Sequence, residues 1–502
     1  MRHTVAISDI HLCEIEPGDG LWMRYRQAPY SPDTEIAAML DTLRRDVRGD
    51  DLSLVLNGDI FDFDAPRVVG DRTVFHDLPR DATHDVPAIR SILDDHREFV
   101  AALGRILADG HTVVFVSGNH DVQLTLPEVR AVIRARVVDA ALAASAPASA
   151  SAPASASAPA SAPSAPPPSR APLEARVLFR AWFHRTPDGI LIEHGNQYDP
   201  YCSYRYPMAP YSRTPGQIQP TMGSLACRLL ISRMGYFNPH VDTSFMLSIF
   251  GYLAHWARYY LFSRRSLAAA WAAGAVRTLL ELVRRREPEH RIRRREALLA
   301  AARETGAPLL AVARHARLFA PPSEDRLGLV ARELWVDRVA LLLTAALLSL
   351  AWFLLAPSSL AIGALLPPLG LIVYELLVPK LPLGATWRGV SRASRQVARA
   401  HRARAVIFGH THNPEGAWER GVFFGNTGSW SAAFEDIACT RPLFAERPLI
   451  WLRSDGDHLS GGLMAWKGGR FEDRDTSETA PSRSCDKPPS SLRPQATAEI
   501  RS

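Results

Sequence analysis

The segment Leu52-Ser53-Leu54-Val55-Leu56-Asn57-Gly58-Asp59-Ile60-Phe61-Asp62 decides the fold, because an apolar, strand-like run ends in a turn that carries two carboxylates. The arrangement recurs four times along the chain. Polar clusters follow apolar runs at Asp9-Ile10-His11, Gly118-Asn119-His120-Asp121, His194-Gly195-Asn196 and Gly409-His410-Thr411-His412. Strands that end in loops with carboxylate, amide and imidazole groups build a site at the carboxyl edge of an α/β sheet. We therefore expect an α/β fold with one site assembled from five loops.

The residue types in these clusters suit metal binding. Asp oxygens and neutral His nitrogens together ligate divalent metals of borderline hardness, and five loops can hold two closely spaced ions. Each cluster alone has a structural alternative. Asp9-Ile10-His11 could be a turn or a helix cap, and Gly118-Asn119-His120-Asp121 could be a tight turn, because Asn and Gly tolerate positive φ. Five such clusters in order, each after an apolar run, favour a metal site.

In order and content, the five clusters resemble the calcineurin-like metallophosphoesterase family. The match covers roughly residues 1–135, 172–200 and 400–432. The segment Asn426-Thr427-Gly428-Ser429-Trp430 also resembles the strand-and-turn segment that follows the family's last histidine pair. The resemblance implies an α/β fold in which two mixed β-sheets, flanked by helices, form a four-layer sandwich. In this chain the sandwich would carry a large helical insertion.

The resemblance also implies a site for two divalent metal ions, with Mn²⁺ favoured and Zn²⁺, Fe or Mg²⁺ as alternatives. His120 matches the family's histidine beside the scissile phosphate, and Asp62 matches the acid that orients it. The acid at Asp121 is expected to be structural. One metal is expected at Asp9, His11, Asp59 and His412, and the second at Asp59, Asn119, His194 and His410, with Asp59 bridging the two.

Such a site predicts a hydrolase of phosphomonoester, phosphodiester or pyrophosphate bonds. Two cations about 3.5–4 Å apart share a hydroxide, lower its pKa and direct it at phosphorus in line with the leaving group. A protonated His120 could then give its proton to the leaving oxygen. Asp62 would keep that imidazole cationic and correctly turned. No Ser or Cys lies in a recognisable nucleophile motif, so no protein nucleophile is expected.

Length and composition agree with a multidomain chain in a reducing compartment. A chain of 502 residues allows two or three domains, and 47% hydrophobic residues is ordinary for a globular protein. The five cysteines are odd in number and lack paired spacing, so we expect no disulfide framework. No charged-then-apolar leader precedes the first strand. We therefore expect no cleavable signal peptide and a catalytic part in the cytosol.

Two long segments interrupt the expected core. Residues 141–168 are nearly pure Ala, Ser and Pro, which cannot bury enough apolar surface to order the chain, so a mobile loop is predicted there. A helix is expected from Pro127 to Ala144 before this loop, and a β-hairpin of Arg176–His184 with Gly189–Glu193 after it. The predicted parts are core at 1–140, 171–200 and 386–471, the low-complexity loop at 141–170, a helical insertion at 201–385 and a disordered tail at 472–502.

The insertion predicts contact with a membrane. Ser244 to Val283 is rich in large apolar and aromatic residues, and an arginine-rich run at 284–295 follows it. This combination suits a membrane interface better than nucleic acid, which we consider a disfavoured partner. A buried helix with a solvated charged face is the alternative interpretation.

The insertion also contains two long apolar runs, at Val339–Ala356 and Leu360–Val378, the second interrupted by Pro367-Pro368. The first is long enough to approach a bilayer span. Basic residues lie outside both ends of the pair, which the positive-inside rule assigns to the cytoplasm. We therefore expect a membrane hairpin at 339–378 and a protein on the cytoplasmic side of the membrane. A helical pair buried in a soluble cap is the alternative.

Three functions follow from these features. The first is a membrane-associated phosphoesterase acting on a lipid-linked substrate. A helical insertion before the last histidine pair is similar to the UDP-2,3-diacylglucosamine pyrophosphohydrolase branch. That branch, however, carries arginine where this chain has His120, and its insertion is far shorter. The second is a membrane-tethered phosphatase or nucleotide phosphodiesterase for soluble substrates. The third, a non-catalytic membrane scaffold on a degenerate fold, is disfavoured because all seven expected ligand positions are filled.

Overall fold

The computed structural model describes residues 1–18, 20, 23–74, 79–146, 169–212, 216–233, 257, 267–285, 290–355, 360–377, 384–434, 438–442 and 446–474. Most of the predicted low-complexity loop and nearly all of the predicted tail lie outside these residues. Of the aromatic-rich stretch Ser244–Val283, residues 244–256 and 258–266 also lie outside them.

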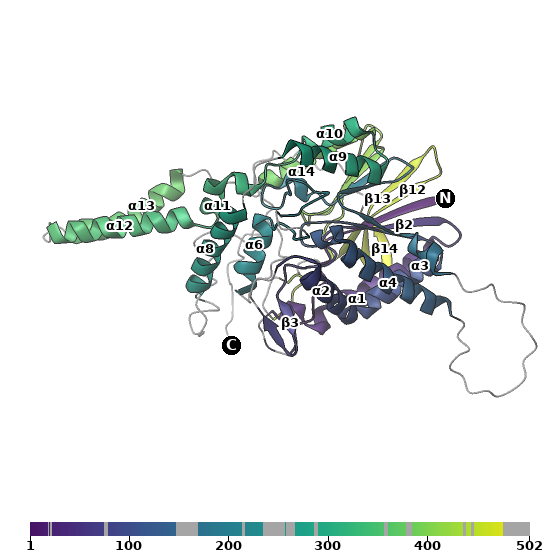
Figure 1. The fold of residues 1–502 in the computed structure, drawn as a ribbon, viewed down its shortest axis with the longest axis horizontal. Helices are drawn as coiled ribbons and strands as arrows, with labels where there is room; N and C mark the ends of the chain where they lie inside the picture. The colour runs from purple at the N-terminus through teal and green to yellow at the C-terminus, as the bar shows by residue number, and fades with distance from the viewer. Residues whose placement is uncertain are drawn as a thin grey trace, which may run out of the picture.

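Two mixed β-sheets form the centre of an α/β fold (Figure 1). Four strands of the first sheet, β1, β2, β5 and β6, are parallel, and three antiparallel strands from the end of the chain extend it beyond β1. In spatial order, its strands are β14 (Arg470–Asp473), β13 (Leu459–Lys467), β12 (Arg447–Ser454), β1 (Arg2–Ile7), β2 (Asp51–Asn57), β5 (Thr112–Val116) and β6 (Val177–Arg180).

The second sheet has three parallel strands at its centre, β11, β9 and β8, and an antiparallel strand at each edge. A separate hairpin of β3 (Arg67–Val69) and β4 (Arg72–Val74) lies apart from both sheets. In spatial order, the strands of the second sheet are β10 (Glu415–Glu419), β11 (Val422–Asn426), β9 (Ala405–Phe408), β8 (Ile190–Glu193) and β7 (Phe183–Arg185).

The predicted hairpin of Arg176–His184 with Gly189–Glu193 is wrong in its first strand. That stretch forms two strands, of which β6 pairs with β5 in the first sheet and β7 pairs with β8 in the second. Trp182 lies at the crossing between the sheets and is buried, and its indole N–H donates to the Glu193 carboxylate at 2.8 Å. The chain therefore changes sheet at a buried aromatic residue that carries no turn signal.

Apolar side chains fill the space between the two sheets. Val55 and Val114 of the first sheet belong to the same buried cluster as Ile192 and Ile407 of the second. The central strands are buried almost throughout, as expected for parallel strands that are covered on both faces. The two sheets therefore pack face to face.

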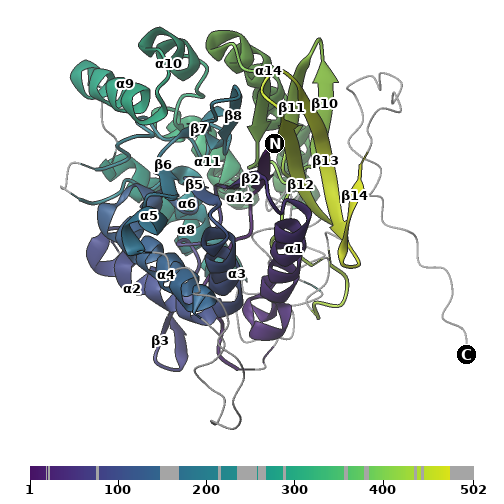
Figure 2. The ribbon, with the colours of Figure 1, turned by 90° about the vertical axis from the view of Figure 1, so that its right-hand side faces the viewer.

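Helices cover the outer face of each sheet, and Figure 2 shows the two groups on opposite sides of the strands. The helix predicted from Pro127 to Ala144 is confirmed as α4, and the short α5 (Arg170–Glu174) lies beside it. The first sheet is covered by α1 (Asp33–Asp46), α2 (Ala82–Asp95), α3 (Arg97–Ala108) and α4 (Pro127–Ser145), and the second by α9 (Arg291–Thr305), α10 (Leu309–Ala316) and α14 (Gly384–His401).

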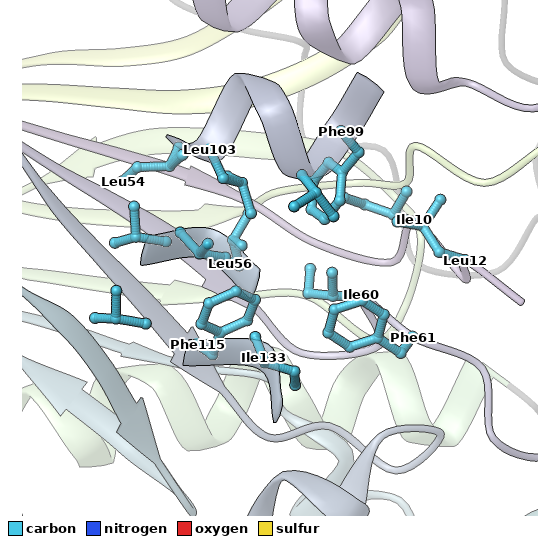
Figure 3. Close-up of a cluster of buried hydrophobic side chains, with 14 of the residues drawn as sticks. Ile10, Leu12, Leu54, Leu56, Ile60, Phe61, Phe99, Leu103, Phe115 and Ile133 are labelled. Carbon is cyan, nitrogen blue, oxygen red and sulfur yellow. The ribbon is translucent and has the colours of Figure 1, made fainter. Parts of the chain in front are cut away.

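The largest apolar cluster joins the first sheet to its helices. Figure 3 shows Leu54, Leu56 and Phe115 of the sheet beside Leu103 of α3 and Ile133 of α4. The apolar residues of α3 recur at helical spacing, which gives that helix one buried face. Complete burial of a side chain such as Phe115 contributes about 1.5–3 kcal/mol.

The inserted segment has a part that packs on the core. Helices α6 (Met222–Leu229), α8 (Leu267–Arg285) and α11 (Leu327–Glu333) share an apolar cluster, and we call these three helices the cap. Helix α10 is tied to β8 by fully buried polar groups. His315 Nε2 lies 3.0 Å from a Glu193 oxygen that also accepts a 2.6 Å hydrogen bond from the Tyr198 hydroxyl.

The other part is a helical hairpin of α12 (Val336–Leu355) and α13 (Leu360–Leu377) that projects from the body (Figure 1). By length and composition, α12 could cross a membrane, and it is the single described helix that meets this criterion. Only Ala345 of α12 is buried, whereas Leu347 is 67% and Leu354 is 70% exposed. Pro367 and Pro368, which interrupt the second apolar run, lie inside α13, although each proline removes one backbone donor.

Candidate metal centre

The five polar clusters meet at one edge of the paired sheets. Strands β1, β2 and β5 are parallel neighbours in the first sheet, and β8 and β9 are parallel neighbours in the second, so their following loops share an edge. Backbone hydrogen bonds join these loops directly. Asp9 N–H donates to the Gly58 carbonyl at 3.1 Å, and Gly409 N–H donates to the His194 carbonyl at 2.8 Å.

One predicted ligand group consists of Asp9, His11 and His412. Their potential ligand atoms all lie within 4.8 Å of one another, as a shared metal requires. His412 Nε2 is 3.1 Å from Asp9 Oδ1, and the rings of His11 and His412 meet edge to face with centroids 5.6 Å apart. Asp9 is completely buried, whereas the His11 and His412 side chains are slightly exposed.

The second group consists of Asp59, His194 and His410, again with ligand atoms within 4.8 Å of one another. His194 Nε2 lies 3.0 Å from Asp59 Oδ2 and 4.0 Å from Asp9 Oδ1, so it stands between carboxylates of the two groups. Its other nitrogen, Nδ1, lies 2.9 Å from the Asn57 carbonyl. That contact fixes the ring and directs Nε2 at the site.

The predicted ligand Asn119 lies in the loop after β5 and is buried. The next backbone N–H, that of His120, donates to Asp59 Oδ1 at 2.7 Å and holds this loop against the carboxylate. Gly118 is required here, because an added Cβ would lie 2.2 Å from the same Asp59 oxygen. Asp121, expected to be structural, accepts from the N–H groups of Gly118 (2.7 Å) and Ile60 (2.9 Å) and so joins two loops.

The donor atoms at this edge fit metal ions. Asn119 Oδ1 is buried and has no hydrogen-bond partner among the described residues. The buried atoms Asp9 Oδ1 and His194 Nε2 face other potential ligand atoms, His412 Nε2 at 3.1 Å and Asp59 Oδ2 at 3.0 Å. A buried polar group without a partner costs about 1–3 kcal/mol. A cation shared by the Asp and His atoms of each group would satisfy them, and the structure thus contains buried His/Asp groups that could hold metal ions.

The carboxylates at this edge are expected to be charged. Burial alone raises the pKa of Asp9 and Asp59, but nearby imidazoles, His194 foremost, outweigh it. The pKa of Asp9 is lowered and that of Asp59 lies well below its usual value. Two adjacent buried anions favour a compensating positive charge.

Backbone conformation also marks this edge. Of the ten described non-glycine residues with positive φ, five are predicted metal ligands. Such backbone costs of the order of 1–3 kcal/mol per residue and gathers at functional sites. These five are Asp9 (φ 53°), His11 (55°), Asp59 (51°), His410 (66°) and His412 (56°).

His120 and Asp62 form the predicted pair. His120 Nδ1 is 3.1 Å from Asp62 Oδ1, and the same oxygen accepts from the backbone N–H groups of Asp64 (2.9 Å) and Ala65 (3.1 Å). Burial lowers the pKa of His120, but the charges of Asp62 and Asp59 more than offset it and raise the pKa to about 10. These carboxylates therefore favour the protonated form of His120.

Asp64 is a buried carboxylate beside His120 that no sequence pattern had indicated. Asp64 Oδ2 lies 3.5 Å from His120 Nδ1, and Asp64 Oδ1 accepts from the Ser224 hydroxyl at 2.7 Å and pairs with Arg80 at 2.9 Å. Ser224 belongs to α6, so the cap reaches the site through these contacts.

The sequence analysis did not identify Asp199 and Cys202 either. With His410 they form a further group of potential ligand atoms within 4.8 Å. Only the spacing of Asp199 after His194 could have suggested it.

The segment after the last histidine pair holds the backbone of Asp9, a member of the first ligand group. The backbone N–H of Trp430 and the Ser429 hydroxyl donate to the Asp9 carbonyl at 3.1 and 3.0 Å. Trp430 is completely buried. These contacts join the loop after β11 to the loop after β1 and fix the position of Asp9.

A cavity of about 310 Å³ lies between the core and the inserted helices. Aromatic side chains and Arg294 and Arg317 line it. Tyr204, another lining residue, donates its hydroxyl to the carbonyl of the predicted ligand Asn119 at 3.2 Å, so this residue links the cavity to the loop after β5.

Comparison of the chain with protein-family models, with curated proteins and with solved structures gives no match.

Proposed function

We propose that the chain is a membrane-anchored, metal-dependent phosphoesterase of the calcineurin-like family. The observation that carries this proposal is the convergence of two buried Asp/His groups at one sheet edge, with the His120–Asp62 pair beside them. Helices on the outer face of each of two face-to-face sheets support the further proposal that the core is a four-layer sandwich of the calcineurin-like type.

The two ligand groups are proposed to hold two divalent cations, with Mn²⁺ as the favoured metal. The proposed shared ligand is Asp59, which lies next to His194 and accepts a hydrogen bond from the His120 backbone N–H. When bound, two such cations supply Lewis acidity that activates water and neutralises charge on the phosphoryl oxygens. The ligands expected for the first ion are Asp9, His11, Asp59 and His412, and for the second Asp59, Asn119, His194 and His410.

The residues beside the ligands have separate proposed roles. His120 donates a proton to the leaving oxygen, and Asp62, fixed by two backbone N–H groups, holds the imidazole in the required orientation. Burial raises the pKa of the thiols of Cys13, Cys202 and Cys227, so they remain poor nucleophiles. The proposed reaction therefore uses water and no protein nucleophile.

The exposed hairpin supports the membrane part of the proposal. A helix of 20 residues, such as α12, is about 30 Å long, which matches the hydrocarbon thickness of a bilayer. At the base of the hairpin the Arg338 guanidinium lies 5.5 Å from the Trp335 ring and 5.7 Å from the Tyr374 ring. Aromatic and basic residues of this kind are typical of a membrane–water boundary. Because β9 follows the hairpin in sequence, both of its ends lie on one side, proposed to be the cytoplasmic side.

The position of the cap favours a lipid-linked substrate over a soluble one. Helix α11 leads directly into α12, and α6 of the same cap contacts Asp64 beside His120. Strand β1 starts on the side of the body away from the hairpin and runs toward it (Figure 1). The sheet edge that carries the five polar clusters, here called the metal edge, therefore faces the hairpin side. The second candidate, a membrane-tethered phosphatase or nucleotide phosphodiesterase for soluble substrates, is favoured by the short polar path from Asn119 to the arginine-lined cavity.

Substrate profiling of the full chain tests both the metal mechanism and the choice between a lipid-linked and a soluble substrate. The detergent-purified protein is stripped of metal, refilled with Mn²⁺ and assayed with aryl phosphomonoesters, aryl phosphodiesters and pyrophosphates, each in a water-soluble and a micellar form. We expect hydrolysis that depends on about two bound ions per chain, with higher kcat/KM for the micellar form. Full activity of the metal-free protein in chelator would refute the metal mechanism. Equal kcat/KM for both forms would favour the soluble-substrate candidate.

A further inference from the structure

Asp199 and His410 form a close pair at the side of the second ligand group. Asp199 follows the short 3₁₀ helix Asn196–Tyr198 in the loop after β8, and His410 lies in the loop after β9. His410 Nε2 is 3.1 Å from Asp199 Oδ2, and the two side chains are only 10% and 12% exposed. The loop that supplies the predicted ligand His194 therefore also supplies a carboxylate to a second predicted ligand.

The Asp199 carboxylate is held by its own loop. Its Oδ1 accepts from the Tyr201 N–H at 2.8 Å, and its backbone carbonyl accepts from the N–H groups of Cys202 (3.1 Å) and Ser203 (2.8 Å). Oδ2 is thus the oxygen that faces the imidazole. The cap packs on the same loop, because Gly223 N–H donates to the Tyr201 carbonyl at 2.8 Å. Asp199 is therefore an anchored acceptor whose position does not depend on His410.

His410 is fixed from its backbone as well. Its N–H donates to Asp9 Oδ2 at 3.1 Å, and its φ of 66° holds the residue in a left-handed conformation. An imidazole has two nitrogens, and a metal can take only one that bears no proton. If Nε2 carries the proton and donates it to Asp199, Nδ1 is the nitrogen that remains for a metal. A carboxylate on the outer nitrogen of a metal-binding histidine fixes both tautomer and ring orientation.

We propose that Asp199 is a positioning residue that holds His410 with its proton on Nε2 and so prepares Nδ1 to bind the second metal ion. This inference rests on the proposed function, because it assumes that His410 is a metal ligand. It differs from a third metal site at Asp199, Cys202 and His410, in which Asp199 and the Cys202 thiol would be ligands themselves.

Metal-binding measurements on Asp199 variants test the proposal. Full-length protein is stripped of metal and titrated with Mn²⁺, and bound ions are counted by elemental analysis, while electron paramagnetic resonance distinguishes a coupled Mn²⁺ pair from an isolated ion. Asp199→Ala should weaken one of the two ions by about 10–100-fold and leave the other nearly unchanged. Asp199→Asn should be intermediate, because its amide oxygen still accepts from Nε2–H. The isolated-ion spectrum should then appear at Mn²⁺ concentrations that give the wild type a coupled pair.

Three controls separate the alternatives. Asp325→Ala removes a carboxylate that pairs with Arg205 in the insertion and should leave both affinities unchanged. Cys202→Ser should also retain two ions, and a third ion in the wild type that this variant loses would overturn the proposal. The metal-free Asp199→Ala protein should melt close to the metal-free wild type, which excludes general misfolding. If the wild type binds two ions and Asp199→Ala binds both equally well, this inference fails alone, whereas a wild type that binds no metal refutes the proposed function.

Discussion

The metal edge and the α12–α13 hairpin depart from the usual distribution of polar and apolar residues in opposite directions. At the edge, charged groups such as Asp9 and Asp59 are almost completely buried. In the hairpin, Leu347 and Leu354 are largely exposed. Buried charge requires a compensating partner, and a large exposed apolar surface requires an apolar environment. The proposed function accounts for both regions, with a cation bound at the edge and lipid around the hairpin.

The largest effect is expected from Asp59→Asn. This change removes one negative charge and the proposed shared ligand from a completely buried position, so phosphoesterase activity should fall below detection and metal content should drop. The matched control is Asp41→Asn, because Asp41 pairs with Arg105 on the surface, away from the metal edge. Near-normal turnover by Asp59→Asn, with the control equally active, would show that buried charge at this edge does not serve metal catalysis.

The next largest effect is expected from His120→Ala. Loss of a positioned general acid should lower kcat by about 10²–10⁴ while the number of bound metal ions stays the same. The loss should shrink for a nitrophenol leaving group, which needs no proton. An equal loss for good and poor leaving groups would instead indicate that His120 binds the phosphoryl group.

Replacement of residues 339–378 by a short flexible linker tests whether the exposed hairpin lies in lipid. The wild type should sediment with membranes and resist high-salt and alkaline washes, whereas the variant should be soluble. The variant should keep its activity on a soluble phosphodiester, because the hairpin contributes no predicted ligand. A wild-type chain recovered from the cytosolic fraction without detergent would contradict the assignment of lipid as the hairpin's environment.

A smaller effect is expected from Gly363→Val in α13. A Cβ at Gly363 would lie 3.3 Å from Trp352 Cδ1 and 3.5 Å from the Ser349 carbonyl oxygen, so a larger side chain should push the two helices apart. Overpacking of this kind costs about 1–3 kcal/mol. Gly370→Val is the matched control, because its Cβ would meet nothing within 4 Å among the described atoms. Denaturant unfolding in detergent should distinguish the two, and equal midpoints would contradict the packing.

Sequence patterns predicted the parts of the site that are encoded locally. Predicted ligands such as Asp59 and His194 lie just after apolar strands, and parallel pairing places such loops at one edge. The residues that contact the site from other parts of the chain were not predictable. Ser224 meets Asp64, and Asp199 meets His410, only because of how the cap and the loop after β8 pack, and contacts over such separations leave no pattern in the sequence.

The fold shows the same division. The strand endings and α4 follow from apolar runs and a proline at the helix start. The crossing at Ala181 and Trp182 was missed because it has neither glycine nor proline and resembles a continuous strand. The helical hairpin expected from the two apolar runs agrees with α12 and α13, and α13 continues through Pro367-Pro368.

The buried contact between His315 and Glu193 determines where this chain can be shortened. Excision of the whole predicted insertion at 201–385 would leave the Glu193 carboxylate inside the second sheet without the imidazole, right next to His194. Excision between Trp335 and α14 leaves that contact in place. The insertion thus consists of an integral portion and a detachable one, and a water-soluble version for crystallography or screening should begin its cut at α12, not at residue 201.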